Sequence, residues 1–127
     1  MPLPWLEPED IGFPPIELAL VEPNGLLAIG GSLDPEWLLC AYSQGIIPWY
    51  EDGQPLLWWS PDPRLILTPG LLKVSRSLKR LIKKQCYEIT FDTAFRNVIR
   101  NCAESRSEGA GTWITDQMQA AYSVLHD

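Results

Sequence analysis

Short apolar segments separated by proline and glycine fill the first half of the chain and predict short elements of both kinds. The run 26–29 is followed by two glycines and is typical of a buried strand. Pro35 is suited to the first turn of a helix, and Gly45 is suited to its end. In order, we expect a short helix over 16–20, a strand over 26–29, a helix over 36–44, an irregular apolar loop over 46–50 and a strand over 56–59.

The second half of the chain carries longer helical patterns. Leu78, Leu81 and Ile82 stand at i, i+3 and i+4 and form an apolar stripe, whereas residues 87–91 alternate as in a half-buried strand. We expect a strand over 64–67, a helix from Ser75 or Ser77 to about Lys84 and a strand over 87–91. Asp92 or Thr93 is expected to cap the next helix, which has Phe95, Val98, Ile99 and Cys102 on one face. After a flexible link over 109–111, Thr115 or Asp116 is expected to cap a last helix, whose inward side chains are Met118, Ala121, Tyr122 and Leu125. This mixture predicts an α+β fold.

Proline content and charge both change near residues 60–64. All twelve prolines lie at or before Pro69, and residues 1–63 hold ten acidic side chains and no Lys or Arg. From Arg64 onward there are ten basic and six acidic residues. We therefore predict two domains, a small proline-rich α/β domain over 1–63 and a second domain over 64–127. The last helix reaches Asp127 without a stop signal, so we expect the second domain to be incomplete in this chain.

Composition excludes several classes of protein. The chain has 127 residues, of which 46% are hydrophobic and 20% charged, so a folded core is expected rather than disorder. No stretch approaches the roughly 20 apolar residues that a membrane span requires. The N-terminus lacks the basic region and cleavage site of a signal peptide, which makes the cytoplasm the expected location.

Cysteine and histidine are too few to build the common metal and nucleophile sites. Cys40, Cys86 and Cys102 form no C-x-x-C pair and are expected to be buried thiols, and the single histidine is His126. We predict no metal site, no cofactor and no Ser-His or Cys-His dyad. Residues 30–32 could receive an anion at a helix N-terminus, but they lack the phosphate-binding motifs, which favours a plain turn.

One short region concentrates positive charge. Six of the ten basic residues lie between Lys73 and Lys84, with no acidic residue among them. Such a helix can bind the phosphates of a nucleic acid, and the alternative is a solvated surface helix. Solvated helices usually mix charges so that residues at i and i+4 pair, which favours phosphate binding here.

Six tryptophans are many for a chain of this length, and several stand beside Pro or Gly. On a loop, an aromatic ring can stack on a base or form the wall of an apolar pocket. For Trp58 and Trp59 a core position is the favoured interpretation. For Trp49 and Trp113, a core position and a binding position remain equally open.

Two motifs, LWWSPDPR over 57–64 and GTWIT over 111–115, form a highly specific combination. Together with five further segments they resemble the bacterial leucyl/phenylalanyl-tRNA–protein transferase family, and the resemblance spans essentially the whole chain. The five further segments are 13–15, 22–28, 30–31, 45–50 and 74–77. The resemblance implies a small N-terminal domain followed by a GNAT-like acyltransferase domain.

The resemblance also implies an activity. Members of this family move Leu, Phe or, less well, Met from aminoacyl-tRNA to the N-terminal amine of proteins that begin with Arg or Lys, and the products enter N-degron proteolysis. The expected partners are therefore aminoacyl-tRNA and such proteins, with no membrane and no cofactor. Two alternatives remain: a non-catalytic tRNA-binding module that uses the helix 75–84, and a structural fragment without RNA affinity.

Site residues follow from the same resemblance. Trp49 and Trp113 match family positions at the aminoacyl-adenosine site, with Tyr122 nearby. Arg76, Arg80 and Lys83 match the basic cluster that holds the tRNA acceptor stem, and Lys79 and Lys84 on the same helix complete our tRNA-binding candidates. The catalytic residues are expected beyond Asp127, so we predict negligible transferase activity for this chain alone. We further expect self-association through the open edge of the second domain.

Overall fold

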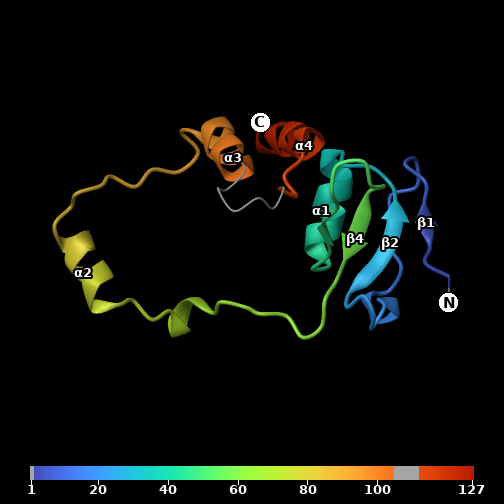
Figure 1. Cartoon of the computed structure of the whole chain (residues 1–127), viewed down its shortest axis with the longest axis horizontal. Coiled ribbons are helices and arrows are strands. Elements are labelled where there is room, and N and C mark those ends of the chain that lie inside the picture. The colour runs from blue at the N-terminus through green and yellow to red at the C-terminus, as the bar shows by residue number, and fades with distance from the viewer. Residues whose placement is uncertain (1, 105–111) are drawn as a thin grey trace. The chain divides into compact units, whose positions relative to one another are not determined.

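The computed structural model of this chain describes residues 2–104 and 112–127 (Figure 1). The chain divides into two compact units. The first combines Met1–Asp62 with Phe95–Asp127 and is called the core unit below; the second is Pro63–Ala94 and is called the basic segment, because it holds seven basic and two acidic residues. The division into domains 1–63 and 64–127 stays a prediction.

A four-stranded sheet lies in the core unit. Its strands are β1 (Trp5–Leu6), β2 (Leu26–Gly30), β3 (Ile47–Pro48) and β4 (Leu57–Trp59), in the order β1-β2-β4-β3. β1 runs parallel to β2, and the other pairs are antiparallel. The predicted strands over 26–29 and 56–59 are confirmed. β1 and β3 were not predicted because two residues are too few to show an alternating pattern.

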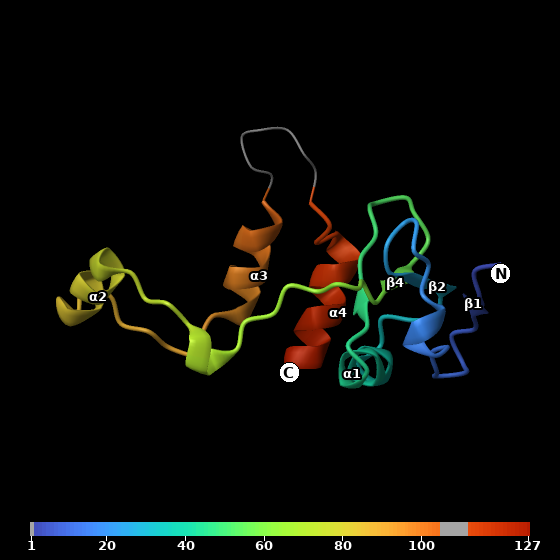
Figure 2. The ribbon, with the colours of Figure 1, turned by 90° about the horizontal axis from the view of Figure 1, so that it is seen from below.

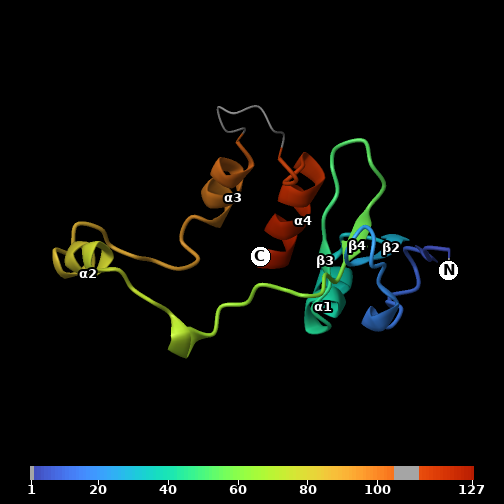
Figure 3. The ribbon, with the colours of Figure 1, turned by 60° about the horizontal axis from the view of Figure 1, so that its bottom comes forward.

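Helix α1 (Pro35–Ser43) lies beside this sheet (Figures 1 and 3). Aromatic rings form a large part of the core between them. Trp37 and Trp58 are fully buried and stack with ring centroids 6.1 Å apart, and the Phe13 ring meets both edge-on. Each buried indole N–H has an acceptor, because Trp37 Nε1 donates to the Pro8 carbonyl at 3.0 Å and Trp58 Nε1 to the Gly30 carbonyl at 2.8 Å. The predicted core position of Trp58 is confirmed.

Glycine is required at the turn between β2 and α1. Gly31 has a φ of +75°, and a Cβ at this position would come within 3.0 Å of the Trp37 ring. The turn is therefore set by close packing against the core, which supports the plain-turn interpretation of residues 30–32. Before it, the predicted helix over 16–20 is a 3-10 turn, Ile16–Leu18.

Helix α4 (Asp116–His126) completes the core, and α3 (Phe95–Ala103) lies beside it (Figure 2). Thr115 Oγ1 accepts from the Met118 N–H at 3.2 Å, which confirms Thr115 as the cap, and Met118 is fully buried. α3 begins at Phe95, three and two residues after the predicted caps Asp92 and Thr93, and the Thr93 hydroxyl is hydrogen-bonded to Thr90 Oγ1 at 2.8 Å. The link over 109–111 lies outside the described residues.

The basic segment contains a 3-10 turn, Pro69–Leu71, and helix α2 (Arg76–Lys83). Ser75 Oγ accepts from the Leu78 N–H at 3.2 Å, which confirms Ser75 as the cap. The predicted strands over 64–67 and 87–91 are wrong, and their apolar side chains are exposed. A strand needs a neighbouring strand to pair its backbone N–H and C=O groups, and no residue of 63–94 is in a strand.

The described part of the chain thus has the predicted mixed α+β content, with four α-helices and one sheet. Among these residues no helix is long and apolar enough to cross a membrane. The expectation of buried thiols is wrong for two of three cysteines: Cys40 is half-buried, whereas Cys86 and Cys102 are exposed. Cys86 lies in the basic segment, in which no residue is buried, and Cys102 lies on α3, which packs against α4.

Candidate functional site

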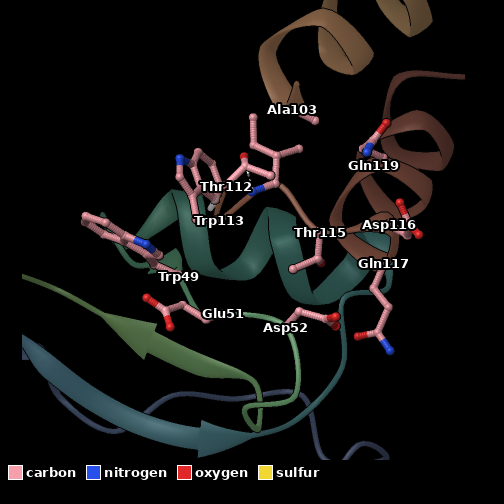
Figure 4. A pocket seen from close by; sticks show the side chains of 11 residues that line it. Trp49, Glu51, Asp52, Ala103, Thr112, Trp113, Thr115, Asp116, Gln117 and Gln119 are labelled. Carbon is pink, nitrogen blue, oxygen red and sulfur yellow. Dashed lines mark hydrogen bonds between the residues drawn. The ribbon is translucent and has the colours of Figure 1, made fainter. Parts of the chain in front are cut away.

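A cavity of about 710 Å³ opens in the core unit beside the start of α4 (Figure 4). Its walls come from the loop after β3, the C-terminal end of α3, and the segment that leads into α4. The lining residues are Trp49, Glu51, Asp52, Ala103, Thr112, Trp113, Ile114, Thr115, Asp116, Gln117 and Gln119. Segments more than 60 positions apart in the sequence therefore meet at one cavity.

The two tryptophans that the sequence left open both line this cavity. Their ring centroids are 6.5 Å apart with the planes at 53°, and the exposed fractions are 54% for Trp49 and 43% for Trp113. The rings are tilted and keep accessible faces, unlike the buried, stacked pair of the core. Such an arrangement offers a flat apolar ligand two aromatic surfaces.

Backbone and side-chain hydrogen bonds fix the position of Trp49. Its N–H donates to the Leu57 carbonyl at 3.0 Å, and its carbonyl accepts from Trp59 Nε1 at 2.7 Å. The next residue, Tyr50, is buried, and its hydroxyl donates to Gln117 Oε1 at 3.1 Å. Tyr50 and Gln117 thus tie the loop of Trp49 to the first turn of α4. Sequence reasoning missed both, because an H-bond across 67 positions leaves no local pattern.

Trp113 is held by the approach to α4. Thr112 Oγ1 accepts from the Ile114 N–H at 3.1 Å, and Thr115 caps the helix that follows. Because Met118 is buried in the core, the first turn of α4 is held in place, and Trp113 stands three residues before that helix begins. The motif GTWIT therefore places its tryptophan through two threonine hydroxyls that bond to backbone N–H groups.

The charged side chains of the cavity lining are all acidic: Glu51, Asp52 and Asp116. A cavity with aromatic faces and carboxylates suits a ligand that has a flat ring and a cationic group. Among the described residues that line the cavity, none is Ser, Cys, His or Lys, and the Thr112 and Thr115 hydroxyls accept backbone hydrogen bonds. Within the described residues no group of His, Cys, Asp and Glu could hold a metal ion.

Tyr122 lies elsewhere, at the contact between α1 and α4. Its hydroxyl is hydrogen-bonded to the Tyr42 hydroxyl, and it is not among the residues that line the cavity. Burial raises the pKa of Tyr122 well above its ordinary value, and the hydrogen bond with Tyr42 raises it further. The structure thus brings Trp49 and Trp113 together without Tyr122, whose binding role stays a prediction.

The predicted tRNA-binding residues are all on α2 or at its C-terminal end, within the basic segment. The side chains of Arg76, Lys79, Arg80, Lys83 and Lys84 are exposed. The stripe Leu78, Leu81 and Ile82 is also largely exposed. α2 is therefore an exposed, capped cationic helix, and its role in binding RNA stays a prediction.

Comparisons with known proteins identify the family. Residues 31–62 match the family model for the leucyl/phenylalanyl-tRNA protein transferase N-terminal domain, and residues 66–127 match the leucyl/phenylalanyl-tRNA protein transferase model. The gap between the matches falls at 63–65, near the change in proline content and charge.

Curated relatives agree with the family models. The chain is 55% identical over 125 residues to the leucyl/phenylalanyl-tRNA–protein transferase of Azoarcus sp. (strain BH72), covering 98% of this chain and 53% of that protein. The identity is 58% with the transferase of Stutzerimonas stutzeri and 56% with that of Pseudomonas aeruginosa (strain PAO1), each over 98% of this chain and 55% of the relative. The chain thus spans about half the length of these relatives. It belongs to the leucyl/phenylalanyl-tRNA–protein transferase family.

Proposed function

We propose that this chain provides the aminoacyl-tRNA-binding surface of a transferase that moves Leu, Phe or, less well, Met to the N-terminal amine of proteins beginning with Arg or Lys. Its products would enter N-degron proteolysis in the cytoplasm. The observation that carries the proposal is the pair Trp49 and Trp113, whose accessible rings line one cavity in a chain of this family.

In this proposal the cavity receives the aminoacylated adenosine. The two indole rings stack on or beside the base, since each base has an apolar face that aromatic side chains bind without reading sequence. The carboxylates of Glu51, Asp52 and Asp116 attract the ammonium group of the amino acid and repel a phosphate group in the cavity. Tyr122 would support this site through α4, on which it lies.

The exposed cations of α2 hold the acceptor stem of the tRNA in the same proposal. Phosphate contacts position a nucleic acid without specifying its bases, which suits an enzyme that accepts several tRNAs. Self-association through the open edge of the second domain is part of the same proposal.

The transferase reaction requires more than the cavity provides. The acceptor amine attacks the ester carbonyl, a C–N bond forms, the C–O bond to the ribose breaks, and a proton moves from the amine to the ribose 3′ oxygen. This transfer needs a group that takes the proton and donors that stabilise the oxyanion. The chain spans about half the length of the relatives that are named for this activity, so we propose that it binds the substrate but has negligible activity alone.

A binding measurement tests the site. The probe is phenylalanyl-adenosine with a stable amide in place of the ester, titrated by calorimetry against the full chain. Trp49→Ala and Trp113→Ala should each weaken binding roughly ten-fold, because base stacking contributes about 1–3 kcal/mol. Trp5→Ala is the matched control, since Trp5 is an exposed tryptophan away from the cavity. Equal binding by all four proteins would refute the proposal.

The second candidate function is a tRNA-binding module without catalysis, which the unopposed cations of α2 favour. Charge reversal at Arg76 and Arg80 should weaken tRNA binding under either function. Trp113→Ala should reduce the preference for charged over uncharged tRNA only if the cavity receives the aminoacyl-adenosine. Flat binding curves at low salt would instead indicate a structural fragment.

A further inference from the structure

Positive charge is scarce in the unit that holds the cavity. Residues 2–62 contain no Lys or Arg, and the described residues of 95–127 contain two, Arg96 and Arg100. Both are on α3. The charged residues of the cavity lining are carboxylates, so a phosphate attached to a ligand there is repelled within the cavity. Within the described core unit, such a phosphate can meet cations only along α3.

A groove between α3 and α4 presents these two arginines. It has a volume of about 400 Å³, with Arg96, Ile99 and Arg100 on one side and Gln119, Ala120, Ser123 and Val124 on the other. The groove and the cavity share Gln119, and Ala103 lines the cavity from the same helix that supplies the arginines (Figure 4). The groove is therefore a continuation of the cavity along α3.

The spacing along α3 suits consecutive groups of an extended ligand. At about 1.5 Å of rise per residue, Arg100 lies roughly 4.5 Å and Arg96 roughly 10.5 Å along the helix axis from Ala103. The two arginines are four residues apart and thus lie on one face of the helix. A chain that leaves the cavity would meet first one guanidinium and then the other.

Both guanidinium groups retain capacity for a ligand. Arg100 Nη2 donates to Asn97 Oδ1 at 2.9 Å, and Arg96 Nη2 is paired with Asp127 Oδ2. A guanidinium has five N–H donors, so one hydrogen bond leaves others available. The pair of Arg96 with Asp127 is solvent-exposed, and exposed pairs are weak enough for a phosphate to compete. Asp127 lowers the net positive charge around Arg96, so we expect Arg100 to bind a phosphate more strongly than Arg96 does.

We propose that the groove between α3 and α4 binds the phosphates of the single-stranded nucleotides that precede the aminoacyl-adenosine in the cavity. This inference rests on the proposed function, because it takes the adenosine as the occupant of the cavity. Arg100 and Arg96 contact successive phosphates and give the 3′ end of the RNA its direction over α3. The basic helix α2 holds the double-stranded part of the tRNA separately.

Two probes separate the groove from the cavity. One is the amide-linked phenylalanyl-adenosine, which has no phosphate; the other is a trinucleotide that ends in the same group and carries two phosphates. Arg100→Gln should weaken binding of the trinucleotide about three- to ten-fold and leave the nucleoside unchanged. For the trinucleotide, the slope of log K against the logarithm of the salt concentration should become shallower by about 0.7, which corresponds to the loss of one single-strand phosphate contact. Arg96→Gln should give a smaller effect in the same direction.

A matched variant controls for net charge. Val21→Glu lowers the charge by one, as Arg100→Gln does, but Val21 is 89% exposed and lines neither the groove nor the cavity. It should bind both probes as the wild type does. If Arg100→Gln binds the trinucleotide as tightly as wild type, or weakens both probes equally, the groove is not a phosphate site.

Failure of the proposed function has a different signature. A wild-type chain that binds the trinucleotide but not the nucleoside, and loses binding through Arg100→Gln, has a phosphate groove without an adenosine cavity. That result would support the groove as a phosphate site and reject the cavity as the site of the adenosine. A wild-type chain that binds neither probe would reject both the groove and the cavity.

Discussion

The core unit and the basic segment use similar apolar residues with opposite results. In the core unit, Trp37, Leu38 and Trp58 are fully buried, whereas no residue of Pro63–Ala94 is buried and the side chain of Leu65 is 100% exposed. The two regions differ in their partners. β2 pairs with a strand on either side and shares a core cluster with residues of α1, whereas residues 64–67 pair with no strand. The apolar pattern of a segment therefore specifies which secondary structure it can form, and contacts with distant segments decide whether that structure forms and is buried.

Helices and strands differ in this respect for a physical reason. α2 forms in the basic segment because its hydrogen bonds are local and Ser75 caps its first turn. A strand must satisfy its N–H and C=O groups on another segment. The basic segment thus keeps its predicted helix and loses both predicted strands, although all three patterns were clear in the sequence.

The largest expected effect comes from removing a core ring. Trp58→Ala should lower the free energy of unfolding by about 3–5 kcal/mol, since it leaves a cavity beside Trp37 and Phe13. Leu65→Ala in the basic segment should change it by less than about 0.5 kcal/mol. Urea denaturation monitored by circular dichroism measures both. Similar values for the two variants would show that the contrast between the units is wrong.

A glycine in each unit gives the next comparison. Gly25 has a φ of +89°, and a Cβ there would overlap the backbone of Pro61, so Gly25→Ala should cost about 1–3 kcal/mol or more. Gly70 lies in the 3-10 turn of the basic segment with open space around it. Gly70→Ala should be neutral or slightly stabilising. Thermal unfolding measures the stability of both variants. A Gly25→Ala variant as stable as the wild type would contradict the close packing of Gly25 against Pro61.

Removing helix caps sharpens the comparison. Ser75→Ala and Thr115→Ala each delete one hydroxyl that accepts a backbone N–H at 3.2 Å, and each should cost about 1 kcal/mol. The Thr115→Ala change should lower global stability, because α4 is part of the core. The Ser75→Ala change should only increase amide exchange within α2. Hydrogen exchange together with denaturation separates these results; a global shift from Ser75→Ala would mean that the basic segment unfolds with the core.

The smallest effect concerns alkaline pH. Burial and the bond to Tyr42 raise the pKa of Tyr122, so the folded chain keeps this proton when the unfolded chain releases it near pH 10. The unfolded state then binds fewer protons, and stability falls as the pH rises above about 10. Tyr122→Phe should remove this part of the fall, whereas Tyr87→Phe, at an exposed position of the basic segment, should retain it. Identical profiles for the two variants would contradict the assignment.

Much of the local structure was predictable from the sequence. The strands over 26–29 and 56–59, the helix over 36–44 and the caps Ser75 and Thr115 follow from apolar runs, proline, glycine and hydroxyl positions. The motif GTWIT and the apolar face of α4 also indicated that Trp113 precedes a packed helix. These features depend on neighbours within a few positions, which is the range over which sequence patterns act.

The candidate site was predictable only in part. Trp49 and Trp113 were named from motifs, but their meeting at one cavity depends on α4 packing against the core through Met118. The hydrogen bond between Tyr50 and Gln117 could not be predicted, because it joins a loop to the first turn of α4 through the tertiary fold. The groove with Arg96 and Arg100 arises in the same way, since its second wall is α4.

By itself, the sequence determined the acidic and basic halves, the helices and their caps, and the family motifs, because each depends on local order along the chain. The tertiary structure decided which apolar segments are buried, that the strands over 64–67 and 87–91 do not form, and that Tyr122 pairs with Tyr42 apart from the cavity. Burial and strand pairing are interactions between distant segments, and their free energy exists only once those segments are in contact.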